Sequence, residues 1–258
     1  MKNISVTYKS LFRHKTIAAS VPATWAELSP KQLITVSKLM LNEGTQTEVV
    51  ASLINIPEKV VRKFNPVEMY WILQEFEFLK DFRPRNSFIM RLKGLFPPQN
   101  KLNKMTWAQF VFIESYLDEY NELNSDTAAI SDACLHTLDL FVSHLYLRHS
   151  ENFNHEVCAA RASQQIIKSI DLHTKIAILI NYRLVREWLS SSYPLVFSKR
   201  HDAETQPTER HKKVKNPWIE VYDAIVSDDI LNYDKYGEIE LHVVLKYLKN
   251  KIKKNARS

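Results

Sequence analysis

The hydrophobic pattern of the chain is strongest over residues 171–197, where apolar side chains recur at intervals of three and four. This spacing places an apolar stripe along one side of a helix. The stripe consists of Leu172, Ile176, Ile180, Leu184 and Trp188. Further apolar residues at 177–179 widen it around most of the helix. We therefore predict a buried central helix over residues 171–192, ending before Pro194 because proline disfavours helical backbone in the preceding residue.

Three other predicted helices are recognised by their first residues. Each start has a capping box, in which a Ser, Thr or Asn cap is followed three residues later by Glu or Gln, together with a hydrophobic staple. The three caps are Ser29, Asn65 and Thr106. Asn216 and Pro217 form a fourth start without the staple. Gly44 is expected to end the first of these helices, because glycine adopts the left-handed backbone of a helix C-cap.

The whole pattern predicts a mainly α protein: a multi-helix orthogonal bundle of about eight to ten helices with a minor N-terminal β-hairpin. The chain of 258 residues has only three glycines, which agrees because helices avoid glycine. We expect strands or extended chain at 1–28, a helical core at 29–198, a polar basic linker or loop at 199–215, and a C-terminal helical pair with a basic tail at 216–258. Inside the core, single helices are predicted over residues 127–148 and 158–170.

The scarcity of glycine also narrows the chemistry. No two glycines lie close enough to form a dinucleotide-binding fingerprint, a phosphate-binding loop or a nucleophile elbow. Two cysteines and four histidines cluster in sequence: Cys134, His136, His144, His149, His155 and Cys158. Their spacing contains no CxxC pair and no histidines four residues apart, so we predict no metal site, buried cysteines and surface histidines. We predict no catalytic residue and no cofactor, and a reducing compartment, because two cysteines do not make a disulfide framework.

The formal net charge of +6 is concentrated at the C-terminal end. Residues 241–258 contain five lysines, one arginine and no acid, so the other 240 residues are electrically balanced. The basic side chains are Lys246, Lys249, Lys251, Lys253, Lys254 and Arg257. Such a tail binds nucleic-acid phosphates or an acidic partner through salt-sensitive contacts. The other interpretation, which is the one that we favour from the sequence, is a solvated terminus without a binding role.

Three tryptophans, Trp25, Trp107 and Trp218, lie at or just before predicted helix starts. An aromatic ring at such a position packs the end of a helix against the core, and this is the interpretation that we favour. Each is also a candidate partner-binding residue, because tryptophan is enriched where interfaces gain most of their binding energy.

A series of short landmarks is spread along the chain. They are Val21-Pro22, Trp25, Leu28 and Gln32-Leu33, then Met105-Thr106-Trp107, Gln109-Phe110 and Glu114, then Tyr193-Pro194, Val196-Phe197 and Asn216-Pro217-Trp218. With these landmarks, residues 21–248 resemble a group of helical proteins encoded among the virion-assembly genes of bacterial phages and prophages, near tail components. The resemblance implies a non-enzymatic assembly protein that works through protein contacts, as a chaperone, an adaptor or a minor structural component. It assigns no site residues.

Two functions follow as expectations. The first is a non-enzymatic assembly factor or minor structural protein of a phage-like tail, whose partners are other protein subunits and not small molecules. The second is a nucleic-acid-binding accessory protein, motivated by the basic tail and by the net charge of +3 over residues 199–215. An all-helical enzyme with an unfamiliar site has no motif behind it, and a deep polar cleft ringed by ionisable side chains would contradict the first expectation. No apolar run approaches the ~20 residues of a membrane span, so we expect no membrane partner and a location in the host-cell cytoplasm or the virion.

Overall fold

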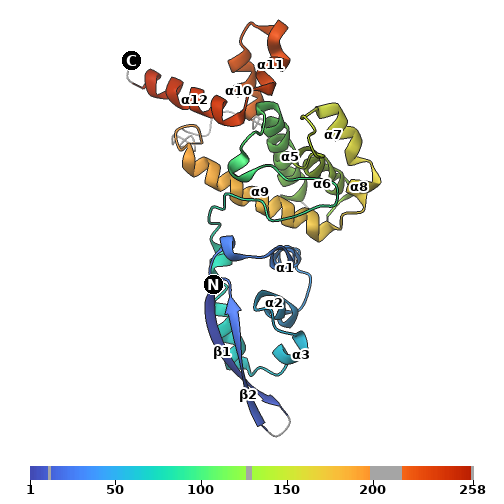
Figure 1. Cartoon of the computed structure of the whole chain (residues 1–258), viewed down its shortest axis with the longest axis vertical. Coiled ribbons are helices and arrows are strands. Elements are labelled where there is room, and N and C mark those ends of the chain that lie inside the picture. Colours follow the sequence, from blue (N-terminus) through green and yellow to red (C-terminus); the bar gives the residue numbers. More distant parts are fainter. Residues whose placement is uncertain (11–12, 126–129, 198–216, 257–258) are drawn as a thin grey trace, which may run out of the picture.

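The computed structural model describes residues 1–10, 13–125, 130–197 and 217–256 (Figure 1). Within these residues it contains twelve α-helices and one two-stranded antiparallel sheet, which confirms the predicted mainly α fold with a minor N-terminal hairpin. The strands are β1 (Lys2–Ser10) and β2 (Arg13–Val21), and the helices are α1 (Pro30–Met40), α2 (Gln46–Leu53), α3 (Glu58–Val61), α4 (Pro66–Gln74), α5 (Trp107–Ser125), α6 (Asp132–Leu145), α7 (His155–Ala162), α8 (Gln165–Lys168), α9 (Leu172–Ser192), α10 (Pro217–Val226), α11 (Tyr233–Glu238) and α12 (Leu241–Asn255).

Helix α9 is the centre of the fold, as predicted. Its residues 175–182 are buried without interruption, and it packs against both α1 and α6. In Figure 1, α9 runs between the half that contains the hairpin with α1–α3 and the half that contains α5–α8. Its buried Asn181 pairs with the irregular segment before α5: Oδ1 accepts a hydrogen bond from Ile89 N at 2.9 Å, and Nδ2 donates to Ser87 O at 3.0 Å. The buried amide is thereby satisfied, which removes the cost of enclosing a polar side chain.

The predicted starts of α1 and α5 are confirmed, but the side chains of their glutamines have different hydrogen-bond partners. At α1 the capping box is complete, because Ser29 Oγ accepts from Gln32 N at 3.3 Å and Gln32 Oε1 accepts from Ser29 N at 2.9 Å. At α5, Thr106 Oγ1 accepts from Gln109 N at 3.2 Å. The Gln109 amide instead donates to His144 O of α6 at 2.8 Å, so it joins two helices.

At the start of α4, too, the cap residue is bonded within the helix while the side chain three residues later is bonded to another element. Asn65 Oδ1 accepts from Glu68 N at 2.8 Å, which confirms the predicted cap. The Glu68 carboxylate accepts from Thr7 N of β1 at 3.1 Å, so it attaches the hairpin to the helix. Val6 and Val21 are buried on the inner side of the hairpin. The sequence therefore located the helix start correctly, while the partner of the glutamate is set by tertiary structure.

Helix α1 ends earlier than predicted, and Gly44 is not its cap. Asn42 adopts the left-handed conformation with φ of 55° directly after the helix. Asn42 N donates to Leu39 O at 3.0 Å and Glu43 N donates to Lys38 O at 2.9 Å, which is the Schellman pattern. Asparagine tolerates this backbone better than most residues, so it serves where glycine was expected.

Two predicted helices differ in length. The segment 158–170 is divided into α7 and α8, because Gln164 between them has extended backbone. The helix expected at 127–148 begins at Asp132, capped by Ser131, and ends at Leu145. The predicted linker at 199–215 and the cap Asn216 lie outside the described residues, and α10 begins at Pro217. Among the described helices, none combines the length and apolarity that a bilayer crossing requires.

Candidate functional site

The structure divides the predicted basic residues into three groups. Lys246 and Lys249 line a groove on the molecular surface. The lysines exposed on the last turns of α12, which extend away from the body in Figure 1, are Lys251, Lys253 and Lys254. Arg257 lies outside the described residues.

The groove also contains two lysines that sequence reasoning missed. Lys101 and Lys104 belong to the irregular segment before α5, and they line the groove with Lys246 and Lys249. The remaining lining residues are Gln99, Asn103, Trp188, Ser192, Tyr193, Glu240 and His242. We term this surface the basic groove; its volume is about 710 Å³, and it is formed by the 99–104 segment, the C-terminal end of α9 and α12. Four lysines from two distant parts of the sequence thus share one concave surface.

His242 fixes the geometry of the basic groove. Its Nε2 lies 2.7 Å from Lys101 O, and its Nδ1 lies 2.9 Å from Tyr193 Oη. Because a carbonyl oxygen only accepts, Nε2 carries the hydrogen and Nδ1 accepts from the tyrosine. Burial raises the pKa of Tyr193, which keeps this donor protonated. Trp188 lies beneath Lys101, whose Nζ is 5.8 Å from the centre of the indole ring.

The segment that carries the two additional lysines has unusual backbone. Lys101, Leu102 and Lys104 have φ of 64°, 58° and 60°, in the left-handed region. This conformation costs about 1–2 kcal/mol for a residue with a side chain. Lys101 N donates to Asn86 O at 2.7 Å and Leu102 is fully buried, so the surrounding structure holds the segment in place. Strained backbone of this kind is concentrated at binding sites.

The three tryptophans proposed as partner-binding residues are buried. Trp25 is 0% exposed, and its indole nitrogen donates to Asp81 O at 2.8 Å. Trp107 is also 0% exposed and Trp218 is 7% exposed, and their rings meet edge to face with centroids 5.7 Å apart. All three therefore pack helix ends into the core, which is the interpretation favoured from the sequence, and none is available to a partner on the surface. Trp71 of α4 is a tryptophan that is exposed, at 65%, and sequence reasoning did not single it out.

A buried carboxylate connects the helices around these rings. Glu114 of α5 accepts hydrogen bonds from Tyr182 Oη at 2.7 Å, from Arg186 Nε at 2.7 Å and from Trp218 Nε1 at 3.2 Å. The carboxylate raises the pKa of Arg186, and burial followed by the same carboxylate raises the pKa of Tyr182 well above its ordinary value. These donors come from α9 and α10, so Glu114 fixes α10 against the body.

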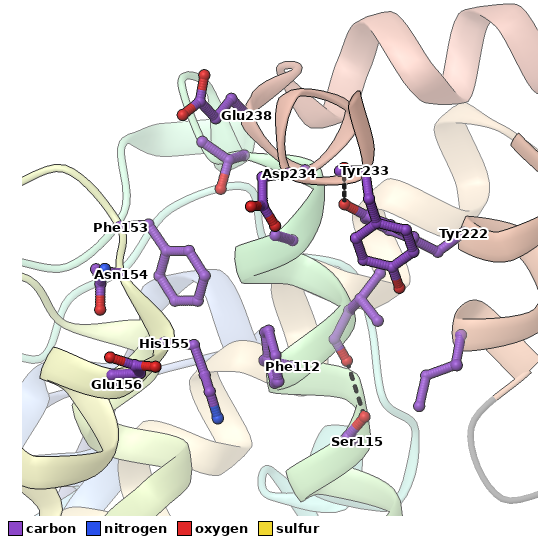
Figure 2. Close-up of a pocket in the computed structure, with 15 residues that line it drawn as sticks. Phe112, Ser115, Phe153, Asn154, His155, Glu156, Tyr222, Tyr233, Asp234 and Glu238 are labelled. Atoms are coloured by element: carbon purple, nitrogen blue, oxygen red, sulfur yellow. Dashed lines mark hydrogen bonds between the residues drawn. The ribbon is translucent and has the colours of Figure 1, made fainter. Parts of the chain in front are cut away.

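A second concave surface lies between α5, the start of α7, α10 and α11 (Figure 2). Its volume is about 650 Å³, and its walls include the aromatic side chains of Phe112, Phe153, Tyr222 and Tyr233. Figure 2 shows Phe153 and His155 on one side, Tyr222 and Tyr233 on the other, and Asp234 between them. Three carboxylates line it, and they belong to Glu156, Asp234 and Glu238. We term this surface the acidic cleft, and the sequence did not predict it. Apolar side chains, among them Val111, Phe112 and Ile219, line it beside the carboxylates, so it is not the deep polar cleft that would contradict the assembly expectation.

A pair of histidines lies at one wall of the acidic cleft. His136 and His149 are exposed, as predicted, but His144 is buried and His155 is half-buried, which corrects the prediction of surface histidines at these two positions. His144 is 0% exposed; its Nδ1 donates to Leu140 O at 2.7 Å, and its Nε2 accepts from His155 Nδ1 at 3.0 Å. Burial lowers the pKa of His144 to about 4 and also lowers that of His155. The His155 ring stacks on Phe112 with centroids 3.9 Å apart. Both imidazoles are therefore neutral at pH 7, and they serve as packing and hydrogen-bonding groups.

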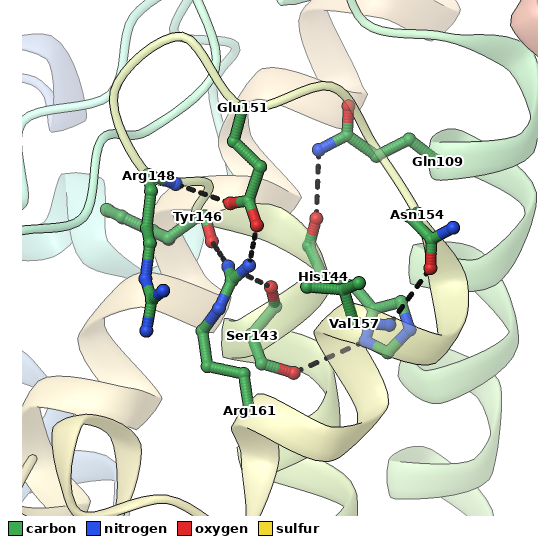
Figure 3. Close-up of polar contacts among 9 residues, drawn as sticks. All are labelled: Gln109, Ser143, His144, Tyr146, Arg148, Glu151, Asn154, Val157 and Arg161. Atoms are coloured by element: carbon green, nitrogen blue, oxygen red, sulfur yellow. Dashed lines mark hydrogen bonds and ion pairs between the residues drawn. The ribbon is translucent and has the colours of Figure 1, made fainter.

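The C-terminal end of α6 beside this pair is satisfied by side chains (Figure 3). Arg161 is 1% exposed; it donates to Ser143 O at 3.4 Å and to Tyr146 O at 3.0 Å, and it pairs with Glu151. Together with the bond from Gln109 to His144 O, these contacts occupy carbonyl groups that a helix end leaves without partners. The polar groups shown in Figure 3 thus stabilise the fold.

Neither the comparison with protein-family models nor those with curated proteins and solved structures yield a match.

Metal-binding geometry is absent from the part of the chain that the structure describes. There, no three His, Cys, Asp or Glu side chains are placed so that they could hold an ion. Cys134 and Cys158 are buried, as predicted, and they are free thiols. In the acidic cleft, Ser115 Oγ donates to Val111 O at 3.1 Å, and His155 Nδ1 is committed to His144.

Proposed function

We propose that this chain is a non-enzymatic assembly factor or minor structural protein of a phage-like tail, and that its basic groove binds an acidic segment of another protein subunit. The observation that carries the proposal is the convergence of Lys101 and Lys104 with Lys246 and Lys249 on one groove. A chance distribution of lysines has no reason to gather them on a concave surface, where opposite charge is attracted most strongly.

The four lysines of the basic groove are available for a partner. Within the residues that the structure describes, none of them forms an ion pair with an acid. An acidic segment lying in the groove would meet Lys101 and Lys104 on one side and α12 on the other, with Trp188 beneath it. Electrostatic complementarity of this kind directs association and orients the partner.

A nucleic-acid-binding accessory role is the second candidate. It is favoured by Lys251 and Lys253, which continue the row of positive charge along α12 beyond the groove. Phosphates are bound by such rows without regard to sequence, with a strong dependence on salt. The host-cell cytoplasm or the virion is the location that fits either role.

The test measures binding of a fluorescent polyglutamate peptide and of a short DNA duplex to the full chain. Reversing two groove charges, in the double variant Lys101→Glu and Lys246→Glu, is expected to weaken peptide binding about tenfold or more, because two attractive contacts become repulsive. The matched control is Lys59→Glu with Lys63→Glu, two exposed lysines near α3 that lie away from the groove. The control is expected to bind like the wild type.

The outcomes separate the two candidates. Peptide binding that depends on the groove supports the assembly role. If the duplex binds more tightly than the peptide, and if the salt dependence of duplex binding becomes shallower when Lys251 and Lys253 are changed to Gln, the nucleic-acid role is supported. Equal binding by the groove variant and the control variant would reject the basic groove as the binding surface.

A further inference from the structure

The acidic cleft has the dimensions of a binding site. Its volume of about 650 Å³ falls within the range of roughly 300–1,000 Å³ that is usual for ligand sites. Ile219 and Tyr233 at its edge are 45% and 42% exposed, so apolar surface remains uncovered there. Uncovered apolar surface around a concave site is typical of a place where a ligand or a partner binds.

The charge of the cleft defines the ligand. No lysine or arginine lines it, whereas Glu156, Asp234 and Glu238 do. All three carboxylates are exposed, and within the described residues none of them forms an ion pair. The chain as a whole has a charge of +6, but the charged side chains that line this cleft are all acidic, so the cleft attracts a positive group.

The aromatic walls specify the form of that positive group. Tyr222 and Tyr233 lie with ring centroids 4.7 Å apart, and Phe112 lies 6.1 Å from Phe153. Aromatic faces attract cations, and an apolar wall also packs against the methylene stem that carries the charge of a lysine or an arginine. A small hydrated metal ion would gain nothing from these rings.

We propose that the acidic cleft binds a lysine side chain from the basic end of α12 of a second copy of this chain. This inference goes beyond the proposed function, because it concerns a different surface with the opposite charge. The end of α12 projects from the body and carries exposed residues that include Lys251 and Lys253, so its charge is complementary to that of the cleft (Figure 1).

The experiment uses the full chain and a labelled synthetic peptide with the sequence of residues 246–256, KYLKNKIKKNA. Neutralising the cleft by Asp234→Asn with Glu238→Gln is expected to weaken peptide binding about tenfold. Phe153→Leu keeps an apolar side chain without the aromatic face, and it is expected to weaken binding about threefold. The matched control, Asp81→Asn with Glu119→Gln, removes two exposed acids elsewhere and is expected to bind like the wild type. Circular dichroism verifies that each variant is folded.

Sedimentation velocity tests whether a second copy is the occupant. If wild type self-associates and the cleft variant and a Lys251→Gln, Lys253→Gln variant do not, a second copy supplies the basic segment, through a head-to-tail interface. If all three are monomeric, the second copy is rejected as the occupant, and a peptide that still binds wild type and not the cleft variant would point to another basic protein. The proposal is overturned if the peptide does not bind, or if it binds the cleft variant and the control equally. The basic groove is intact in every cleft variant, so this result does not depend on the polyglutamate test.

Discussion

The basic groove and the acidic cleft are built on the same body but in different ways. Their volumes are similar, about 710 Å³ and 650 Å³, and each is completed by C-terminal helices: α12 for the groove, α10 and α11 for the cleft. In the groove, a backbone segment in the left-handed conformation is held by His242. In the cleft, stacked rings set the walls, and Glu114 fixes the first of its C-terminal helices. The comparison teaches that exposed charges define what each surface attracts, while groups packed beneath them define its shape.

The largest predicted effect concerns the attachment of α10, on which the acidic cleft depends. Glu114→Ala leaves Tyr182, Trp218 and Arg186 without their shared acceptor. Losing one member of a fully buried ion pair costs about 3–5 kcal/mol. Because the Arg186 side chain is 36% exposed, we expect the free energy of unfolding in urea to fall by about 3 kcal/mol, the lower end of this range. Glu119→Ala, an exposed residue of the same helix, serves as the control and is expected to change stability by less than about 0.5 kcal/mol. Equal stability of the two variants would show that the cluster does not hold the fold.

The next predicted effect is a pH dependence of stability that arises beside the acidic cleft and not at the basic groove. The pKa of His144 is lowered from 6.5 to about 4 in the folded protein, so the unfolded chain binds more protons between these values. Stability is therefore complete above pH 6.5 and decreases as the pH falls toward 4, by about 3 kcal/mol from this group. Urea unfolding at pH 7 and pH 4 measures the loss, and His144→Gln is expected to make it about 3 kcal/mol smaller. His136→Gln, at an exposed position of the same helix, is expected to keep the wild-type loss; a similar loss in all three proteins would contradict the prediction.

The smallest predicted effects come from removing a glycine at the acidic cleft and introducing one at the basic groove. A Cβ at Gly237 of α11 would lie 2.8 Å from Tyr222 Oη and 3.0 Å from Ala108 Cβ. Gly237→Ala should therefore push α11 outward and cost about 1–2 kcal/mol. Lys104→Gly relieves a left-handed backbone in the groove and should stabilise the protein by about 1 kcal/mol or less. Thermal unfolding measures whether each variant is more or less stable than the wild type. If both variants change stability in the same direction, the predicted difference in backbone between the two surfaces is wrong.

The sequence predicted local features better than distant ones, for a physical reason. A helix start depends on residues within one turn, so Ser29, Asn65 and Thr106 were identified correctly. The end of α1 was misplaced because Asn42 and Gly44 both favour left-handed backbone, and the choice between them is made by hydrogen bonds around the loop.

The two candidate surfaces could be predicted only in part. The lysines of α12 were identified, but the groove needs Lys101, which His242 contacts across 141 residues of sequence. The acidic cleft joins residues from four helices whose spacing carries no periodic signal. The burial of His144 depends on helices packed around α6, and a histidine within a mostly apolar segment is compatible with either a surface or a core position.

The continuous burial of α9 over residues 175–182 has a consequence for the expression of fragments of the protein. A helix that is covered on every face contacts the residues on both sides of it. Either fragment expressed alone would therefore expose to solvent the apolar surface that α9 and its neighbours bury against each other. Truncation at the loop before α5 or before α9 should therefore yield aggregates instead of shorter soluble pieces, so useful variants will be made by substitution and not by dissection.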